Sequence, residues 1–325
     1  MSTFLAMQDA SILEEPAHYF PFANRQYSTA PGLHKLSTDF GNGLADNRIF
    51  QLDDQWQTYR NNKETCRKEN LEKYYCRQHE RIESRSRVCQ FMISQLLHNY
   101  PSLFSLEQDG KAHEFRNRLL EETIRFDQAG NLLAPDQYAD LLDALAFQIQ
   151  EDFAIWQKKG DKDWMSTIHL SAPNHWAPSE KIGSPFSSVH QPVADMERMR
   201  QRYQPMLKSL MKGGSFVRFA WGLSTDTRLN HHPVPPQGID PNAWEGRSFD
   251  PDHPILFVRT ERQTLTGFPE VEAVLFTIRT YFENVNALNA TQKFQLRQAL
   301  KSMSQDTLEY KGLSRDYVKL LSYLS

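Results

Sequence analysis

The sequence lacks any long apolar run. None of its 325 residues belongs to an apolar stretch of about 18 residues, the length that a membrane-spanning helix needs. The first residues also lack the charged-then-apolar order of a secretory signal. From these two absences we expect a soluble protein of the cytoplasm.

Cysteine is scarce as well. The chain has three, Cys66, Cys76 and Cys89, and their spacings match no zinc or iron–sulfur pattern. Three thiols cannot hold a cluster that needs four, and an odd number argues against a disulfide framework. Cys89 lies in an apolar segment, so we expect a buried, inert thiol there rather than a thiolate ligand.

A large net charge and the common catalytic motifs are also missing. Lys and Arg number 37 against 40 Asp and Glu, so the net charge of −3 gives no basic field for nucleic acid. The sequence contains no phosphate-binding loop, no dinucleotide fingerprint, no nucleophile elbow and no H-E-x-x-H zinc helix. The chemistry therefore has to be sought in less standard patterns.

Helix formers dominate several parts of the chain. Residues 56–100 contain no Gly or Pro, which predicts a largely helical region. The apolar spacing after Pro135 predicts a helix that ends near Lys158–Gly160. A further helix is expected over 196–211, and helices again from Ala287 to the end.

Runs rich in β-branched and aromatic residues predict strands. The segment RFDQAGNLL at 125–133 is typical of a hairpin connection, and TGFPE is short enough to join two later strands as a hairpin. Helices followed by adjacent strands and then more helices favour an α+β fold with an antiparallel sheet. Strands are expected at Met165–Leu170, Ser215–Leu223, Ile255–Leu265 and Val271–Phe282.

The stretch from Trp164 to Val193 carries three of the eleven histidines and four prolines. After its strand-like start it becomes rich in turns and delivers His190 between Val189 and an extended Gln-Pro step. A histidine on such a stiff, half-apolar path suits an axial metal ligand, because its ring needs a fixed direction. The alternative is an ordinary core or surface histidine.

Charged residues interrupt three strands that are otherwise apolar. Period-two alternation places Arg218 on one face with Phe216 and Ala220, and Glu261 on one face with Arg259 and Gln263. Arg279 shares its face with Leu275, Thr277 and Tyr281. Charges on a half-buried sheet indicate either a structural Arg–Glu network or a pocket in which an arginine and a glutamate converge.

Several segments together resemble the alpha-subunit family of haem-dependent oxidative N-demethylases. The matching segments are LSAPNHWAPSEKIGSPF (170–186), VHQPV (189–193), VRFAW (217–221), VRTERQTL (258–265) and VLFTIRTY (274–281). They lie in the family's order and extend, with weaker upstream matches, over most of residues 20–285. One position departs from the pattern, because Ala220 stands where we expect a polar residue in many relatives.

The resemblance implies a PAS-like antiparallel sheet that binds haem b, surrounded by additional N- and C-terminal helices. Residues 1–160 would form a mainly helical region, 161–285 the haem-binding core and 286–325 the C-terminal helices. His190 is similar in position to the axial iron ligand, and Arg218 and Glu261 to the catalytic pair that polarises oxygen and holds the substrate amine.

The implied reaction is oxidative N-demethylation of a small secondary amine such as dimethylamine, with O2 and with electrons from a separate reductase. The chain has no nicotinamide fingerprint and too few cysteines for a 2Fe-2S cluster, so FMN and 2Fe-2S are expected on that partner. A haem-based gas or redox sensor, or a haem-binding module without turnover, is the alternative. Whether Lys181 and Arg279 meet the haem propionates is left open by the sequence.

Overall fold

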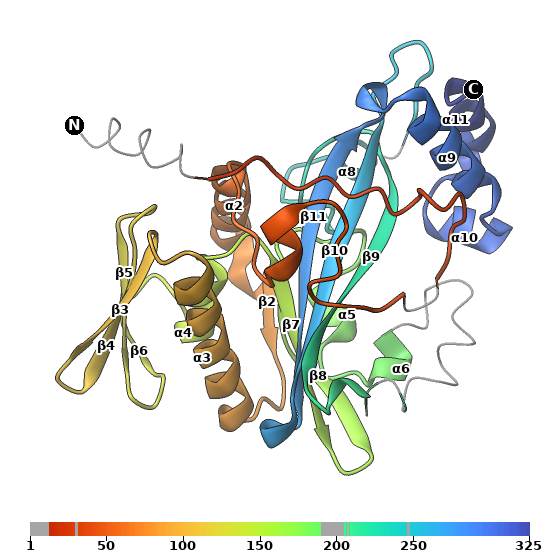
Figure 1. The fold of residues 1–325 in the computed structure, drawn as a ribbon. Helices are drawn as coiled ribbons and strands as arrows, with labels where there is room; N and C mark the ends of the chain where they lie inside the picture. The colour runs from red at the N-terminus through yellow and green to blue at the C-terminus, as the bar shows by residue number, and fades with distance from the viewer. Residues whose placement is uncertain (1–12, 30–31, 190–204, 206, 208, 246–247) are drawn as a thin grey trace, which may run out of the picture.

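The computed structural model describes residues 13–29, 32–189, 205, 207, 209–245 and 248–325. Two antiparallel sheets and several helices make up this part of the chain (Figure 1). The large sheet has the strand order β1-β9-β10-β11-β7-β8-β2, and the small sheet has the order β3-β4-β5-β6. The expected α+β class is confirmed.

The strands differ greatly in length between the two sheets. Long strands form the centre of the large sheet, and short ones form its edges and the small sheet. The large sheet consists of β1 (His34–Lys35), β2 (Tyr75–Arg77), β7 (Asp152–Lys159), β8 (Lys162–His169), β9 (Gly214–Ser224), β10 (Phe257–Phe268) and β11 (Ala273–Asn284). The small sheet consists of β3 (Phe104–Asp109), β4 (Ala112–Asn117), β5 (Glu122–Asp127) and β6 (Leu132–Ala134).

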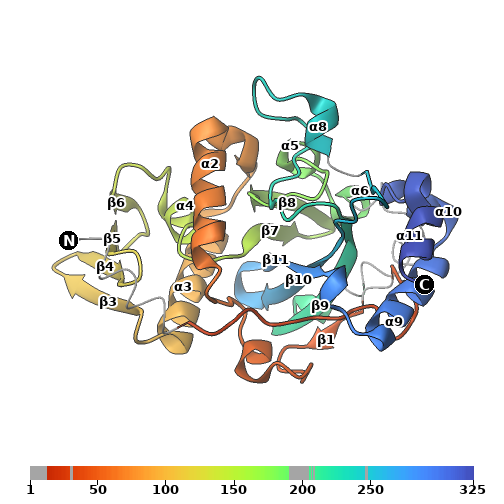
Figure 2. The same cartoon turned by 90° about the horizontal axis from the view of Figure 1, so that it is seen from above.

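The helices fall into three groups. Seen from above, the large sheet separates α3, α4 and the small sheet from α5 and α6, and α9 to α11 gather beside β9 and β10 (Figure 2). The α-helices are α2 (Trp56–Tyr74), α3 (Ile82–Asn99), α4 (Leu141–Ala146), α5 (Pro178–Lys181), α6 (Phe186–Val189), α8 (Pro241–Glu245), α9 (Ala290–Lys301), α10 (Gln305–Tyr310) and α11 (Tyr317–Tyr323). Short 3-10 turns lie at Gly43–Asn47, Pro269–Val271, Val285–Ala287 and Ser314–Asp316.

The three late strands form as expected, and their register defines two faces. β10 pairs with both β9 and β11, and the turn between β10 and β11 is the expected hairpin. Glu261 lies opposite Ala220 on one side and Thr280 on the other, while Gln263 lies opposite Arg218. Directly opposed residues share a face, so Arg218 and Glu261 project to the same side of the sheet.

The helix expected between Pro135 and Lys159 is wrong for most of its length. Only α4 is α-helical there, and Asp152–Lys159 is strand β7 in the middle of the large sheet. Its residues from 152 to 157 are all buried. A strand covered on both faces has no polar alternation, so its apolar run can be mistaken for one side of a helix.

The first 160 residues carry more strand than expected. Alongside α2 and α3 they include the whole small sheet and β7, and the expected hairpin at 125–133 is present as β5 and β6. The turn between β7 and β8 lies at residue 160, so the large sheet takes strands from both sides of the expected boundary. The helix expected over 196–211 falls mostly outside the described residues.

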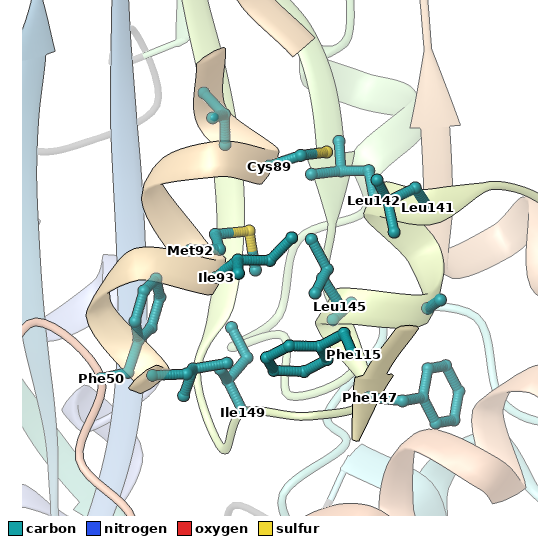
Figure 3. Close-up of a cluster of buried hydrophobic side chains, with 14 of the residues drawn as sticks. Phe50, Cys89, Met92, Ile93, Phe115, Leu141, Leu142, Leu145, Phe147 and Ile149 are labelled. Atoms are coloured by element: carbon teal, nitrogen blue, oxygen red, sulfur yellow. The ribbon is translucent and has the colours of Figure 1, made fainter. Parts of the chain in front are cut away.

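A continuous apolar core joins the two sheets through α3 and α4. Met92 and Ile93 on α3 pack with Leu142 and Leu145 on α4 (Figure 3). Inner side chains of both sheets belong to the same core. Cys89 belongs to this core, and burial raises the pKa of its thiol above its usual value. The expected burial of Cys89 is confirmed, and its lack of reactivity stays a prediction.

The opposite face of the large sheet carries a second, smaller apolar cluster. Here Trp156, Met165, Ile278 and others pack against α6 and against Leu207 and Leu210. The chain at Leu210 approaches β10 so closely that a Cβ on Gly267 would lie 1.9 Å from the Leu210 carbonyl oxygen. Glycine is therefore required at 267 to seat this segment on the sheet.

Candidate functional site: a charged cavity on one face of the sheet

A large cavity lies on the face of the sheet that α5 and α6 cover. The free space between the atoms that line it is about 1670 Å³, including the part open to solvent. Its walls are mainly apolar or aromatic and include Trp156, Trp176, Phe186, Phe276 and Ile278. Mainly apolar walls with a few charged side chains are typical of small-molecule sites.

Arg218 projects into this cavity from β9. It makes no hydrogen bond or ion pair within the described part of the chain, and its Nε atom is buried without a partner. Burial lowers the pKa of the guanidinium, although the nearby Tyr27 and Glu261 act in the opposite direction. A partly buried cation without a partner is costly, which indicates that an anionic or electron-rich group belongs beside it.

Glu261 faces the same cavity from β10. Its Oε2 accepts a hydrogen bond of 2.9 Å from Gln263 Nε2, the next side chain on that face. The negative charge of Glu261 raises the pKa values of Arg218 and Lys181 against the effect of burial. Arg218 and Glu261, which the sequence singled out separately, therefore share one cavity.

Lys181 lines the cavity from α5. Its ammonium lies 4.0 Å from the centre of the Trp176 ring, a cation–π contact. Burial lowers the pKa of Lys181 to about 8, and the charges of Glu261 and Glu180 only partly offset this effect. Lys181 has no hydrogen bond or ion pair to another described residue.

Arg259 also lines the cavity, and both of its terminal nitrogens hold loop residues. Its Nη2 donates to the carbonyl oxygens of Ala172 at 2.9 Å and Pro173 at 3.3 Å. Its Nη1 lies 2.6 Å from His231 Nδ1, and the Nε2 of the same ring lies 3.0 Å from Asp226 Oδ1. Since arginine can only donate, Nδ1 accepts and the Nε2 proton points to Asp226.

Sequence reasoning missed this Arg259–His231–Asp226 chain. His231 lies beside His232 in the loop after β9, where it is only 3% exposed and pairs with Asn174 through a β-bridge. The loop that carries Trp176 and Lys181 is thereby tied to β10, two residues before Glu261. The signal in the sequence that could have pointed to this segment is the length of the loop between β9 and β10, because long loops in compact domains are often functional.

Arg279 and Arg262 lie on the other face of the sheet. Arg279 Nη2 donates to Asp53 Oδ2 at 2.7 Å, and Arg262 Nη2 donates to the carbonyl of Arg48 at 2.7 Å. Arg279 shares its side of the sheet with Tyr281, as predicted, and it is only 1% exposed. The open question about Arg279 is thus answered, because it points away from the cavity.

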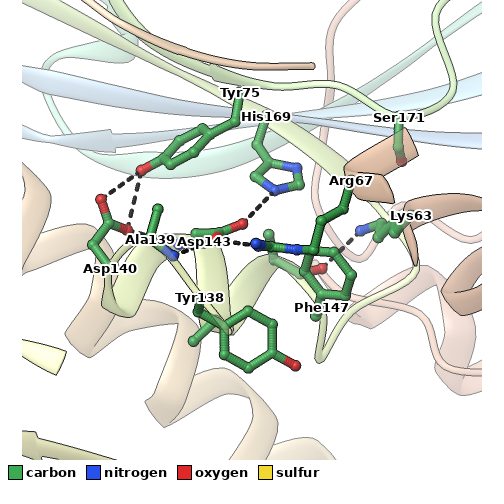
Figure 4. A network of polar contacts seen from close by, with 12 residues as sticks. Lys63, Arg67, Tyr75, Tyr138, Ala139, Asp140, Asp143, Phe147, His169 and Ser171 are labelled. Carbon is green, nitrogen blue, oxygen red and sulfur yellow. Dashed lines mark hydrogen bonds and ion pairs between the residues drawn. The ribbon is translucent and has the colours of Figure 1, made fainter. Parts of the chain in front are cut away.

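Of the three histidines in the Trp164–Val193 stretch, the structure describes two, and they lie in different environments. His169 is buried on β8, where its Nε2 lies 3.1 Å from Asp143 Oδ1, and Arg67 pairs with the other oxygen of that carboxylate (Figure 4). His175 lies in a loop and stacks on His231. His190 lies outside the described residues, and its neighbour Val189 is a buried residue of the cavity wall.

Within the described ranges, no three His, Cys, Asp or Glu side chains come together as a metal site. No helix in the same ranges is both long and apolar enough to cross a membrane.

Comparison with known families adds one finding. The model of a protein family described as "haem-dependent oxidative N-demethylase, alpha subunit-like" matches residues 42–321 of this chain. The match takes in both sheets apart from the edge strand β1, and every residue that lines the cavity apart from four near the N-terminus.

Proposed function

Because the chain belongs to the family of haem-dependent oxidative N-demethylase alpha-subunit-like proteins, we propose that it is the haem-binding catalytic subunit of an enzyme that removes methyl groups from a small secondary amine. The observation that carries the proposal is the meeting of Arg218 and Glu261 in one cavity. Arg218 has no hydrogen-bond partner among the described residues, as expected of a side chain that binds a ligand.

Two features of the cavity support the binding of a haem group. Its walls are mainly apolar and aromatic, and Arg218 projects into it without a hydrogen-bond partner among the described residues. We propose that β9, β10 and β11 form a PAS-like haem-binding sheet and that His190 would bind the haem iron. When bound, the haem supplies the redox chemistry that activates O2.

The residues of the chain have the following roles in this proposal. Glu261 holds the substrate amine as an ammonium through its free Oε1, while Gln263 fixes Oε2. Arg218 donates hydrogen bonds to negative charge that develops on oxygen, an effect that is large in a closed site of low dielectric. The apolar wall of Phe276 and Ile278 excludes water from the reacting methyl group.

The overall reaction needs electrons from outside the chain. One oxygen atom enters the N-methyl group, which leaves as formaldehyde, and the other becomes water after uptake of two electrons and two protons. The family's description as an alpha subunit implies a partner subunit. We propose that a reductase with FMN and a 2Fe-2S cluster donates these electrons.

An absorbance spectrum with and without dimethylamine tests the proposal. The purified protein should show a Soret band that shifts on titration with the amine, and formaldehyde should form when a reductase and O2 are supplied. His190→Ala should lose the haem, whereas Glu261→Gln should keep the haem and lose the amine-induced shift. A protein that binds haem but neither responds to amines nor forms formaldehyde would instead be a sensor or a simple haem carrier.

A further inference from the structure

The cavity holds more positive than negative charge. Four cationic side chains line it, namely Lys181, Arg218, Arg259 and Lys311, and among the described residues Glu261 is the only carboxylate in its wall. An enclosed site with excess positive charge is unfavourable unless an anion binds there or the cations are satisfied by other groups. The partners of each cation therefore decide whether an anion is missing.

Two of the four cations are already satisfied. Arg259 donates to backbone carbonyls and to His231. Lys311 Nζ donates to the Trp221 carbonyl at 2.6 Å and lies 5.0 Å from the Tyr27 ring centre. Lys181 and Arg218 remain, and both are within electrostatic reach of Glu261. Two cations against one carboxylate leave room for one more negative charge.

Lys181 is the better candidate to receive that charge. Its ammonium has the Trp176 face on one side, and no described residue gives it a hydrogen bond or an ion pair. Burial makes its charged form unfavourable, and the charges of Glu261 and Glu180 offset only part of this cost. A carboxylate placed beside the ammonium would offset the rest. A single ammonium matches one carboxylate oxygen, whereas phosphate groups are usually held by several donors or an arginine fork.

We propose that Lys181 and Trp176 form a carboxylate-binding subsite, separate from the amine site at Glu261. The carboxylate has two possible sources, a propionate group of the haem or the carboxylate of an N-methyl amino acid whose ammonium lies against Glu261. The choice between these two sources rests on the proposed function; the subsite itself rests on the unpartnered ammonium and on the charge of the cavity.

The porphyrin arm of the test uses metal-free protoporphyrin IX and its dimethyl ester, which lacks the two negative charges. If a propionate occupies the subsite, the acid should bind the wild type about tenfold more tightly than the ester does, the range of one charge-assisted hydrogen bond. Lys181→Met should abolish this preference, and Lys181→Arg should retain most of it. Lys311→Met is the matched control, because it removes a cavity lysine whose ammonium is already satisfied.

The amino-acid arm compares N-methylglycine with dimethylamine by spectral titration of the haem-loaded protein. If the substrate carboxylate occupies the subsite, Lys181→Met should weaken N-methylglycine binding about tenfold and leave dimethylamine binding unchanged. The acetylation rate of Lys181, followed by peptide mass spectrometry in the wild type, gives a reading without any variant. The carboxylate that binds should slow this acetylation, and the dimethyl ester and dimethylamine should not.

The outcomes separate this inference from the proposed function. If haem gives no Soret band, the proposed function fails, while porphyrin discrimination and Lys181 protection still test the subsite. If haem binds but neither carboxylate discriminates between wild type and Lys181→Met, and neither protects Lys181 from acetylation, the subsite is overturned and the proposed function stands.

Discussion

The two faces of the β9–β10–β11 sheet use buried arginine in opposite ways. On the covered face, Arg279 pairs with Asp53 and lies 3.7 Å from the Tyr59 ring centre. Burial opposes its charge, yet the attraction of Tyr59 and Asp53 raises its pKa above the usual value. On the cavity face, Arg218 lacks such partners and burial lowers its pKa.

The contrast indicates that the charge of Arg279 stabilises the fold, whereas the charge of Arg218 serves ligand binding. A buried ion pair is completed when the chain folds, and removal of one partner leaves the other exposed to the full desolvation cost. An unpartnered cation beside a cavity is completed only by a ligand. Replacing each arginine in turn should therefore affect different properties of the protein.

The largest effect on stability is expected from Arg279→Leu. The change leaves the Asp53 carboxylate buried without its cation, and we expect the free energy of unfolding to fall by about 3–5 kcal/mol. Urea unfolding followed by circular dichroism measures it. Adding Asp53→Asn should recover part of the loss, because the amide keeps the bond from Gln150 without a charge. A loss below about 1 kcal/mol would show that the pair is not structural.

Arg218→Leu should give the reverse result. No described residue depends on this guanidinium, so we expect the free energy of unfolding to change by no more than about 1 kcal/mol, and it could rise. Turnover of the amine should fall by about 100- to 1,000-fold, the usual cost of removing one donor that stabilises developing charge. The same urea series and a formaldehyde assay measure both. Destabilisation equal to that of Arg279→Leu would remove the distinction between the faces.

His231→Gln tests a link between the cavity wall and pH. Burial lowers the pKa of His231, the hydrogen bond to Asp226 opposes this shift, and the charge of Arg259 adds to it. Above about pH 6.5 the ring is neutral in both folded and unfolded chains. As the pH falls, the unfolded chain takes up a proton that the folded protein resists, so stability decreases.

For this one histidine, the free energy of unfolding changes by at most about 1.4 kcal/mol per pH unit. Glutamine can accept from Arg259 and donate to Asp226, so the variant should match the wild type at pH 8 and lose less stability between pH 7 and 5. His253→Gln is the control, because that side chain is 86% exposed and should leave the curve unchanged. Identical pH curves for His231→Gln and the wild type would mean that this ring does not resist protonation.

The alternation of side chains along the strands predicted much of the candidate site from the sequence. Period two correctly grouped Arg218 with Ala220, Glu261 with Gln263 and Arg279 with Tyr281, and the register then brought the first two groups together. Alternation cannot say which face opens to a cavity. That depends on α2 and α3 covering one side and α5 and α6 the other, which are long-range contacts.

Other features of the site and fold could not be predicted from the local sequence. The Arg259–His231–Asp226 chain forms only where two loops distant in sequence meet. Strand β7 is apolar on both faces, which hides its alternation and led to a helix prediction. The roles of His190, Arg218 and Glu261 came from the family resemblance, and they stay predictions.

The smallest effect is expected where charges are paired but exposed. On the outer side of the small sheet, Arg116 lies 2.8 Å from Glu114 and 3.4 Å from Glu107. Water already solvates these groups, and holding long side chains together costs conformational entropy, so the pairs add little to stability. Arg116→Ala should leave the urea midpoint unchanged within error, at low salt and at high salt alike. If Arg116→Ala instead lowered the midpoint as much as Arg279→Leu does, pairing would stabilise this fold whether or not the charges are buried. The lack of a partner for Arg218 would then no longer indicate a ligand site.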